Sequence, residues 1–171
     1  MNLKDFKVKL DTPYPEIIDA QKSPKTVAII KNLMAGNDGE LRAILQYFYQ
    51  SSISHEIEPE ISDILEEISI VEMTHLDLLS LAIVNFGGEP RYENGANQYF
   101  STSQVSYYNK LKEALDANIA GEEKAIYNYQ TAITQVENES LKRLFERIIE
   151  DEKLHIKIFK YLKDTVKFLS I

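Results

Sequence analysis

The chain has 171 residues, of which 44% are hydrophobic, and it carries a formal net charge of −8. A chain of this size suits a single domain with a sizeable core, and its negative charge argues against binding to the phosphate backbone of nucleic acids. The absence of cysteine excludes disulfides, iron–sulfur clusters and any thiolate-bound redox metal, so electrons for a redox reaction would have to come from another molecule.

Residues 1–22 predict an extended arm that precedes the helices of the domain. Two Xaa-Pro pairs, beginning at Thr12 and Tyr14, disfavour helix there, and we expect the arm to lie across the rest of the domain or across a partner. The first ten residues alternate charged and isolated apolar side chains, which is unlike a signal peptide, and no run of about 18 apolar residues is present to span a membrane. We therefore expect one cytoplasmic domain over residues 1–171, with its helices in residues 23–171 and no membrane partner.

The first helix is predicted to begin at Ser23-Pro24, because serine can cap a helix and proline suits its first position, and to run to about Ser52. The glycine-rich stretch from Gly36 to Gly39 interrupts this pattern. A break there would start a new helix at Asp38, whereas a continuous helix would place Glu40 near its middle. We favour the continuous helix. Its core-facing seam, with alternating spacings of four and three residues, is Ile29, Leu33, Gly36, Glu40, Ala43 and Tyr47.

The second helix is predicted from Pro59 to about Phe86, where a Gly-Gly-Glu-Pro sequence would end it. Its apolar seam is interrupted only by Glu72 and His75. A charge at a core-facing position costs several kcal/mol unless it is paired or binds a metal, and residues three apart share one helical face. The alternative is that His75 is an ordinary core or surface histidine with an incidental neighbour. His55, in the turn before this helix, lies outside every seam, and we assign it no role. The seam consists of Ile61, Leu65, Ile68, Leu79, Ala82 and Phe86.

The third helix, predicted from about Gln104 to Val136 after a polar crossover over residues 87–103, repeats a pattern of the first. ELRAILQY, which begins at Glu40, and EEKAIYNY, which begins at Glu122, share a basic third residue, Ala-Ile and a final tyrosine. Both glutamates fall on a core-facing seam, so we predict that they are buried, although exposure is the usual state of a single glutamate. The seam of the third helix is Leu111, Leu115, Asn118, Glu122, Ala125, Tyr129, Ala132 and Val136.

The fourth helix is predicted from about Ser140 to Val166, after a short turn. Its seam is interrupted at Glu152 and His155, which gives the chain a second Glu-x-x-His pair. Two such pairs at the break points of two seams are hard to explain by chance. The four seam glutamates each lie near the middle of a predicted helix, so they would meet at one level of a bundle. The seam of the fourth helix is Leu141, Phe145, Ile148, Phe159, Leu162 and Val166.

One glutamate from each of two helices, with one Glu-x-x-His from each of the other two, is the di-metal carboxylate pattern of a four-helix bundle. Over about residues 24–166 the sequence resembles the ferritin-like superfamily, and looks closest to its rubrerythrin and manganese-catalase branches. The resemblance implies an all-α, ferritin-like four-helix bundle with one long crossover between helices 2 and 3. It implies metal ligands at Glu40, Glu72, His75, Glu122, Glu152 and His155.

The resemblance also indicates side chains that support the ligands. Asp151 stands where di-iron relatives have an aspartate that accepts a hydrogen bond from the far nitrogen of the opposite histidine, here His75. The equivalent residue in the second helix is Val71, so His155 needs another partner and the two metal sites should differ. Rubrerythrins carry an extra carboxylate three residues after the third-helix ligand, and this chain has Ala125 there.

The candidate catalytic residues are Asp151 and two tyrosines. Tyr47 and Tyr129 lie seven residues, about 10 Å, beyond the seam glutamates of their helices and on the same faces. They are either core aromatic residues whose hydroxyls bind carboxylates or residues with a redox or proton-transfer role. Glu123 should point away from the site.

Hard oxygen ligands with some nitrogen and no thiolate favour two ions of iron or manganese per chain. The main hypothesis is a redox enzyme, whether peroxidase, catalase or oxidase, that acts on hydrogen peroxide or dioxygen and uses an external electron donor if the metal is iron. The alternatives are iron oxidation for storage and a structural, coat-type bundle in which metal acts as a staple. We expect a homodimer or a larger homo-oligomer.

Overall fold

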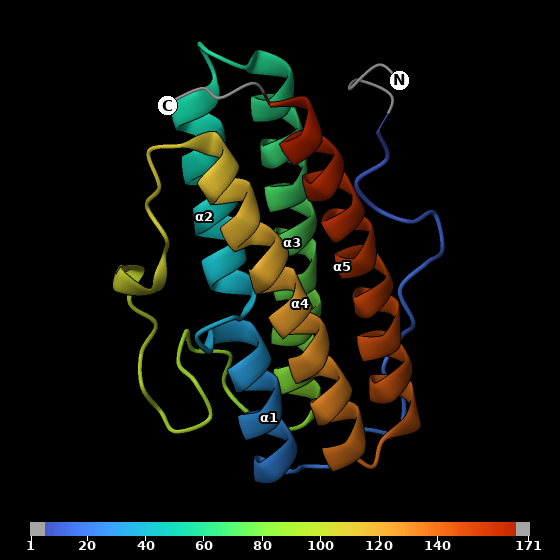
Figure 1. Ribbon diagram of the computed structural model, residues 1–171. Helices are drawn as coiled ribbons and strands as arrows, with labels where there is room; N and C mark the ends of the chain where they lie inside the picture. The colour runs from blue at the N-terminus through green and yellow to red at the C-terminus, as the bar shows by residue number, and fades with distance from the viewer. Residues whose placement is uncertain (1–5, 167–171) are drawn as a thin grey trace.

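The computed structural model describes residues 6–166, which form a bundle of long helices (Figure 1). Three of the four positions in the bundle hold one helix each: α3 (Pro59–Asn85), α4 (Leu111–Gln135) and α5 (Glu139–Thr165). The fourth holds two helices in succession, α1 (Pro24–Ala35) and α2 (Glu40–Ser54). A long crossover links α3 to α4, which confirms the predicted all-α architecture. None of the helices within residues 6–166 is long and apolar enough to cross a membrane.

The prediction of one continuous first helix was wrong, because α1 ends at Ala35 and α2 begins at Glu40. Both glycines of the break lie against backbone. A Cβ atom at Gly36 would overlap the carbonyl oxygen of Asn32, and one at Gly39 would overlap that of Leu33. Glu40 therefore occupies the first position of α2 and not the middle of a helix.

The other helix boundaries follow local signals, with one exception. Ser23 caps α1 by accepting a hydrogen bond from the Thr26 N–H, and Pro59 occupies the first turn of α3. The third helix, which was expected from about Gln104, begins only at Leu111. A short 3₁₀ helix, η2 (Thr102–Gln104), and an extended stretch precede it.

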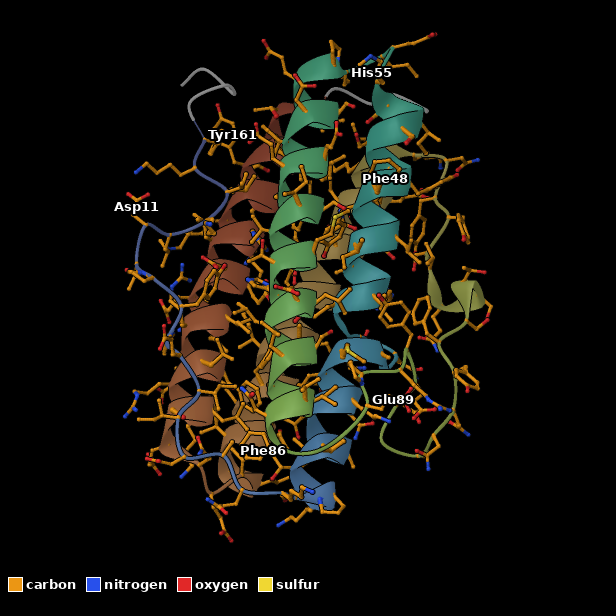
Figure 2. The ribbon with its side chains drawn as sticks, turned by 180° about the vertical axis from the view of Figure 1, so that it is seen from behind. Asp11, Phe48, His55, Phe86, Glu89 and Tyr161 are labelled. Atoms are coloured by element: carbon orange, nitrogen blue, oxygen red, sulfur yellow. The ribbon has the colours of Figure 1, made fainter. Side chains whose placement is uncertain are left out.

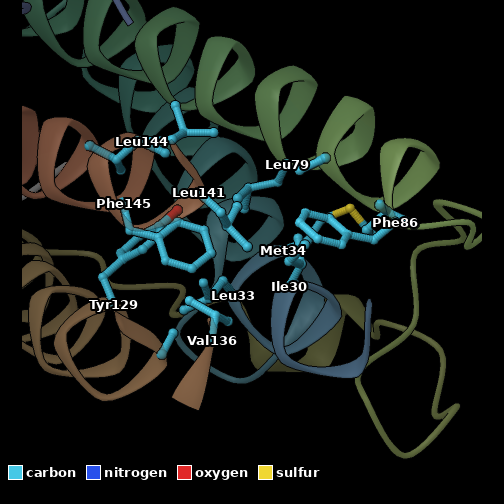
Figure 3. Close-up of a cluster of buried hydrophobic side chains, with 14 of the residues drawn as sticks. Ile30, Leu33, Met34, Leu79, Phe86, Tyr129, Val136, Leu141, Leu144 and Phe145 are labelled. Carbon is cyan, nitrogen blue, oxygen red and sulfur yellow. The ribbon is translucent and has the colours of Figure 1, made fainter. Parts of the chain in front are cut away.

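Apolar side chains fill the bundle in two clusters, one on each side of a polar layer. The first cluster is drawn in Figure 3 and packs the α1 end of the bundle around Phe145 and Met34. The second packs the other end around Phe159 and Leu65. Along α3, α4 and α5, residues of the two clusters flank the predicted polar ligands, so the bundle holds those ligands between two apolar layers.

The N-terminal arm, residues 6–22, runs along α5 in the opposite direction (Figures 1 and 2). Phe6 packs on Tyr161 near the end of α5, with 5.0 Å between ring centroids. At the start of α5, the Ser140 hydroxyl bonds the backbone of Ile18. The arm therefore lies across the bundle of its own chain, as one of the two predicted arrangements.

Candidate metal centre

The structure brings all six predicted ligands together in the polar layer, and none of their side chains is more than 4% exposed. Glu72, Glu122 and Glu152 lie at or next to the middle of α3, α4 and α5. Glu40 reaches the same level because α1 and α2 share one position in the bundle, although its own helix has only just begun.

The six residues form two overlapping groups, and two carboxylates belong to both. Glu40, Glu72, His75 and Glu152 make one group, in which every residue offers a ligand atom within 4.8 Å of the others. The other group consists of Glu72, Glu122, Glu152 and His155.

The histidine contacts show how the sharing works. His75 Nδ1 lies 3.0 Å from Glu72 and 3.2 Å from Glu152. His155 Nδ1 lies 2.9 Å from Glu72 and 3.0 Å from Glu152. The two remaining glutamates are further away, and each approaches only one ring. Glu40 lies 3.7 Å from His75, and Glu122 lies 3.7 Å from His155.

The donor atoms fit two cations. Within residues 6–166, four buried atoms of this cluster lie within ion-pair distance of one another or of His75 but form no hydrogen bond: Glu72 Oε1, both carboxylate oxygens of Glu152, and His155 Nδ1. Buried polar atoms are normally paired, because leaving one unpaired costs about 1–3 kcal/mol. Four carboxylates and two imidazoles supply oxygen and nitrogen ligands suited to iron or manganese, and bound cations would satisfy the unpaired atoms.

Without cations, the cluster holds protons. Burial raises the pKa of Glu122 to about 8, and the charges of Glu72 and Glu152 add to this effect. Burial likewise raises the pKa of Glu40 well above its ordinary value. The pKa of Glu72 is lowered instead, because the charge and hydrogen bonds of the histidines outweigh the effect of burial.

The histidines respond in the opposite sense to burial. Burial alone would lower the pKa of His75 and His155, but the surrounding carboxylates raise both well above the ordinary value. The metal-free cluster is thus a network of protonated and charged partners.

The two predicted tyrosines bind the carboxylates crosswise between α2 and α4. Tyr47 of α2 donates its hydroxyl hydrogen bond to Glu122 of α4 over 2.6 Å, and Tyr129 of α4 donates to Glu40 of α2. Both rings are almost fully buried. The sequence spacing placed each tyrosine on the same face as the glutamate of its own helix. In the structure, each tyrosine instead bonds the glutamate of the opposite helix.

The outer nitrogens of the two histidines have different partners. His75 Nε2 lies 3.3 Å from Asp151 Oδ2, which is the contact implied by the family resemblance. His155 Nε2 donates to the backbone carbonyl of Val8 in the N-terminal arm, over 2.9 Å. On α3 the residue before Glu72 is Val71, whose side chain cannot accept this hydrogen bond. The Val8 carbonyl of the arm therefore accepts it instead of an aspartate.

A small opening between α2 and α4 reaches the cluster. Its volume is about 20 Å³, which is enough for one molecule the size of water. Glu40 and Glu122 line it together with Ala43, Gly121 and Ala125, so the small residues of the two repeated segments leave room beside the carboxylates.

Sequence reasoning missed the residues that surround Asp151. Tyr14 donates to this carboxylate over 2.7 Å, and Arg147 forms an ion pair with it over 2.8 Å. Arg147 could have been noticed, because it lies one helical turn before Asp151. Nothing in the sequence indicated that Tyr14 would fold back on the site. Glu123 points to the surface, as predicted, within 3.9 Å of Lys160.

The family model described as rubrerythrin matches residues 21–163, which include all six clustered side chains. This chain belongs to the rubrerythrin family. The match confirms the resemblance to the ferritin-like di-metal superfamily, and the carboxylate–histidine cluster is of the di-metal type.

Manganese catalases and bacterioferritins are among the proteins similar to this chain. A "probable manganese catalase" of Clostridium acetobutylicum is 21% identical over 168 residues, covering 86% of this chain and 74% of that protein. A manganese catalase from Anabaena superposes with a TM-score of 0.83 at 23% identity, covering 95% of this chain and 84% of that chain.

Bacterioferritins share the same fold. The protein from Desulfovibrio desulfuricans, whose structure contains a di-iron site, gives a TM-score of 0.71 at 24% identity, covering 82% of this chain and 78% of that chain. At these identities the structural likeness establishes the fold, so the predicted ferritin-like bundle is confirmed.

Proposed function

We propose that this rubrerythrin-family protein is a dinuclear manganese enzyme that disproportionates hydrogen peroxide. The observation that carries the proposal is the pair of overlapping ligand groups, which share Glu72 and Glu152. Conversion of peroxide to water or to dioxygen takes two electrons, which is the number that a pair of ions held by these residues would supply or accept. When bound, the ions would supply these redox equivalents, so that two molecules of peroxide give one of dioxygen and two of water.

The supporting residues of the chain fit a small substrate. Glu40 and Glu122 line the opening between α2 and α4, which is narrow enough to admit only small molecules to the carboxylates. The hydroxyls of Tyr129 and Tyr47 bind one oxygen of each carboxylate, which fixes its orientation and leaves its other oxygen for a ligand or a proton. The apolar layers on both sides of the cluster exclude bulk water.

Disproportionation also suits a chain without cysteine. Such a chain has no thiolate-bound metal to deliver electrons one at a time. Peroxide can act as both oxidant and reductant, so the reaction needs no electron donor. The likeness to two manganese catalases supports this choice of metal and reaction.

Iron oxidation is a second candidate, because the donor set suits iron equally and the fold is shared with bacterioferritin. In this case two ferrous ions would give two electrons to one peroxide, forming two molecules of water with two added protons. The site would then stop until an external donor restored the ferrous ions.

Dioxygen release distinguishes the two candidates. Manganese-loaded protein, mixed with hydrogen peroxide in an oxygen electrode without a donor, should release one dioxygen for every two peroxides over many turnovers. Glu152→Ala should abolish the release, whereas Glu123→Ala, which changes the exposed neighbour of Glu122, should leave it unchanged. Iron-loaded protein that consumes about one peroxide per site and then stalls would favour the second candidate. Both fail if neither form reacts faster than free ions.

A further inference from the structure

The outer nitrogen of His155 meets the N-terminal arm, and that of His75 meets Asp151, which the arm contacts. His155 Nε2 must carry its proton to donate to the Val8 carbonyl, so its Nδ1 is the nitrogen that faces the carboxylates. His75 has the same orientation, with Nδ1 toward the carboxylates and Nε2 toward Asp151. The arm therefore reaches one ring directly and the other through Asp151.

The arm holds Asp151 from two sides. The Leu10 N–H donates to its Oδ1 over 2.9 Å, and the Tyr14 hydroxyl donates to its Oδ2, the oxygen nearest His75, over 2.7 Å. Asp151 is fully buried, which by itself would raise the pKa of its carboxyl, but His75, the bonds from the arm and Arg147 together lower that pKa. The carboxylate that orients His75 is thus oriented by the arm.

Tyr14 also contacts His75 itself. The edge of one ring meets the face of the other, at 84° and with 5.9 Å between centroids. The guanidinium of Arg147 lies 4.5 Å from the centre of the Tyr14 ring. Arg147 in turn donates to the carbonyls of Thr12 and Leu10 over 2.8 and 2.9 Å, which fixes the arm at the level of the site.

We propose that residues 8–14 of the arm are a positioning element of the metal centre, and that docking of the arm and retention of metal are coupled. This segment precedes residues 21–163, the part that matches the family model. Residues that orient metal-binding histidines commonly change metal affinity by about 10- to 100-fold. The inference rests on the proposed two-metal site, but it is independent of the reaction with peroxide.

The chain offers a matched pair of variants for the test. Tyr14→Phe removes a hydroxyl that bonds Asp151, and Ser140→Ala removes a hydroxyl that anchors the same arm at Ile18, far along α5 from the histidines. If the arm only stabilises the fold, both variants should act alike. If it positions the histidines, only Tyr14→Phe should weaken metal binding.

The first measurement is the rate at which Mn²⁺ passes from loaded protein to an excess of chelator. We expect Tyr14→Phe to release Mn²⁺ about 10- to 100-fold faster than wild type, and Ser140→Ala to release it at the wild-type rate. Arg147→Lys keeps a positive charge beside Asp151 but lacks the planar fork with which Arg147 holds two carbonyl groups and Asp151 at once, so it should also accelerate release. Equal release rates from wild type and Tyr14→Phe would overturn the proposal.

The second measurement uses the reciprocity of coupling in unaltered protein. Metal should slow hydrogen exchange at the Leu10 amide, which bonds Asp151, and leave the Ile18 amide, which bonds Ser140, unchanged. No difference at Leu10 between metal-free and Mn²⁺-loaded protein would overturn the coupling while the metal site itself stands. Failure of wild type to bind Mn²⁺ would overturn both.

Discussion

At the scale of single residues, the four glutamates of the centre are not equivalent. Glu72 and Glu152 approach both histidines, whereas Glu40 and Glu122 each approach one and are bonded by a tyrosine. In the family pattern all four are simply ligands, but the geometry divides them into a shared pair and two outer carboxylates. Loss of a shared carboxylate should therefore affect both ions, and loss of an outer one mainly its own side.

Metal content tests this division. Glu72→Ala should reduce the bound manganese from two ions per chain toward none, because it removes a donor from both groups, whereas Glu40→Ala should retain about one ion on the His155 side. Elemental analysis after dialysis at a fixed free Mn²⁺ concentration measures the difference, with Glu123→Ala as the exposed control. Equal losses in Glu72→Ala and Glu40→Ala would contradict the division.

At the scale of elements, the break between α1 and α2 decides where Glu40 lies. The two glycines allow the chain to turn against its own backbone, and α2 then begins directly at Glu40. The free N–H groups of a first helical turn favour a negative side chain, so this position also favours the ionised form of Glu40 when metal binds.

Two glycine-to-alanine substitutions distinguish a glycine that is required by close backbone contact at the break from one that only lowers helix propensity. Gly39→Ala should lower the free energy of unfolding by about 1–3 kcal/mol, because its Cβ would overlap the Leu33 carbonyl oxygen. Gly121→Ala should raise it by about 0.5–1 kcal/mol, because Gly121 lies inside α4 with open space beside it. Denaturant unfolding of metal-free protein measures both. Stabilisation by Gly39→Ala would support the continuous helix that the structure excludes.

Much of the bundle could be predicted because the sequence pattern that specifies its helices is local and periodic. The apolar seams located the helices, and their interruptions located the buried glutamates and histidines, which share helical faces at fixed spacings. The break at Gly36 depends on backbone contacts within a turn, which the sequence pattern does not reveal, and the continuous helix was predicted instead. The late start of α4 also followed from non-local bonds, since the Ser106 N–H binds Gln46 of α2.

The contacts of the arm could not be predicted from the sequence either, because they are also non-local. Tyr14 and Asp151 are 137 residues apart, and an irregular segment carries no periodicity that would reveal which face it covers. The resemblance supplied the contact between Asp151 and His75, but not the segment that completes it.

At the scale of the whole molecule, we expect the centre to link stability to pH and to metal. In metal-free protein the pKa values of Glu40, Glu122 and both histidines are raised, so the folded state holds more protons than the unfolded chain near neutral pH. A raised folded pKa gives stability that is lost as the pH rises through it. For Glu122 the loss extends from the ordinary glutamate pKa of 4.5 to about 8.

Melting curves of both forms test this linkage. The melting temperature of metal-free protein should fall between about pH 5 and about pH 8, and the gap to the Mn²⁺-loaded form should widen, because metal replaces the protons. Binding should release protons, which calorimetry in buffers of different ionisation enthalpy would count. A metal-free melting temperature that stays constant over this range would show that the carboxylates do not converge in solution.

Other expectations at this scale stay predictions: a cytoplasmic location, the absence of nucleic-acid binding and a homo-oligomer. Exposed apolar side chains on the outer face of α3, including Ile70, Leu81 and Val84, are compatible with a contact between subunits. His55 ends α2 on the surface, and the structure gives it no contact with the metal centre.

The composition around the polar layer bears on how the protein would withstand hydrogen peroxide, its proposed substrate. Oxidants damage thiols and thioethers according to their exposure, and this chain has no thiol. Of its methionines, Met34 is fully buried in the apolar core, and Met73 lies 43% exposed on the outside of α3. Neither lines the opening to the carboxylates. Excess peroxide should therefore spare the six clustered side chains and, of these two methionines, convert Met73 to its sulfoxide first.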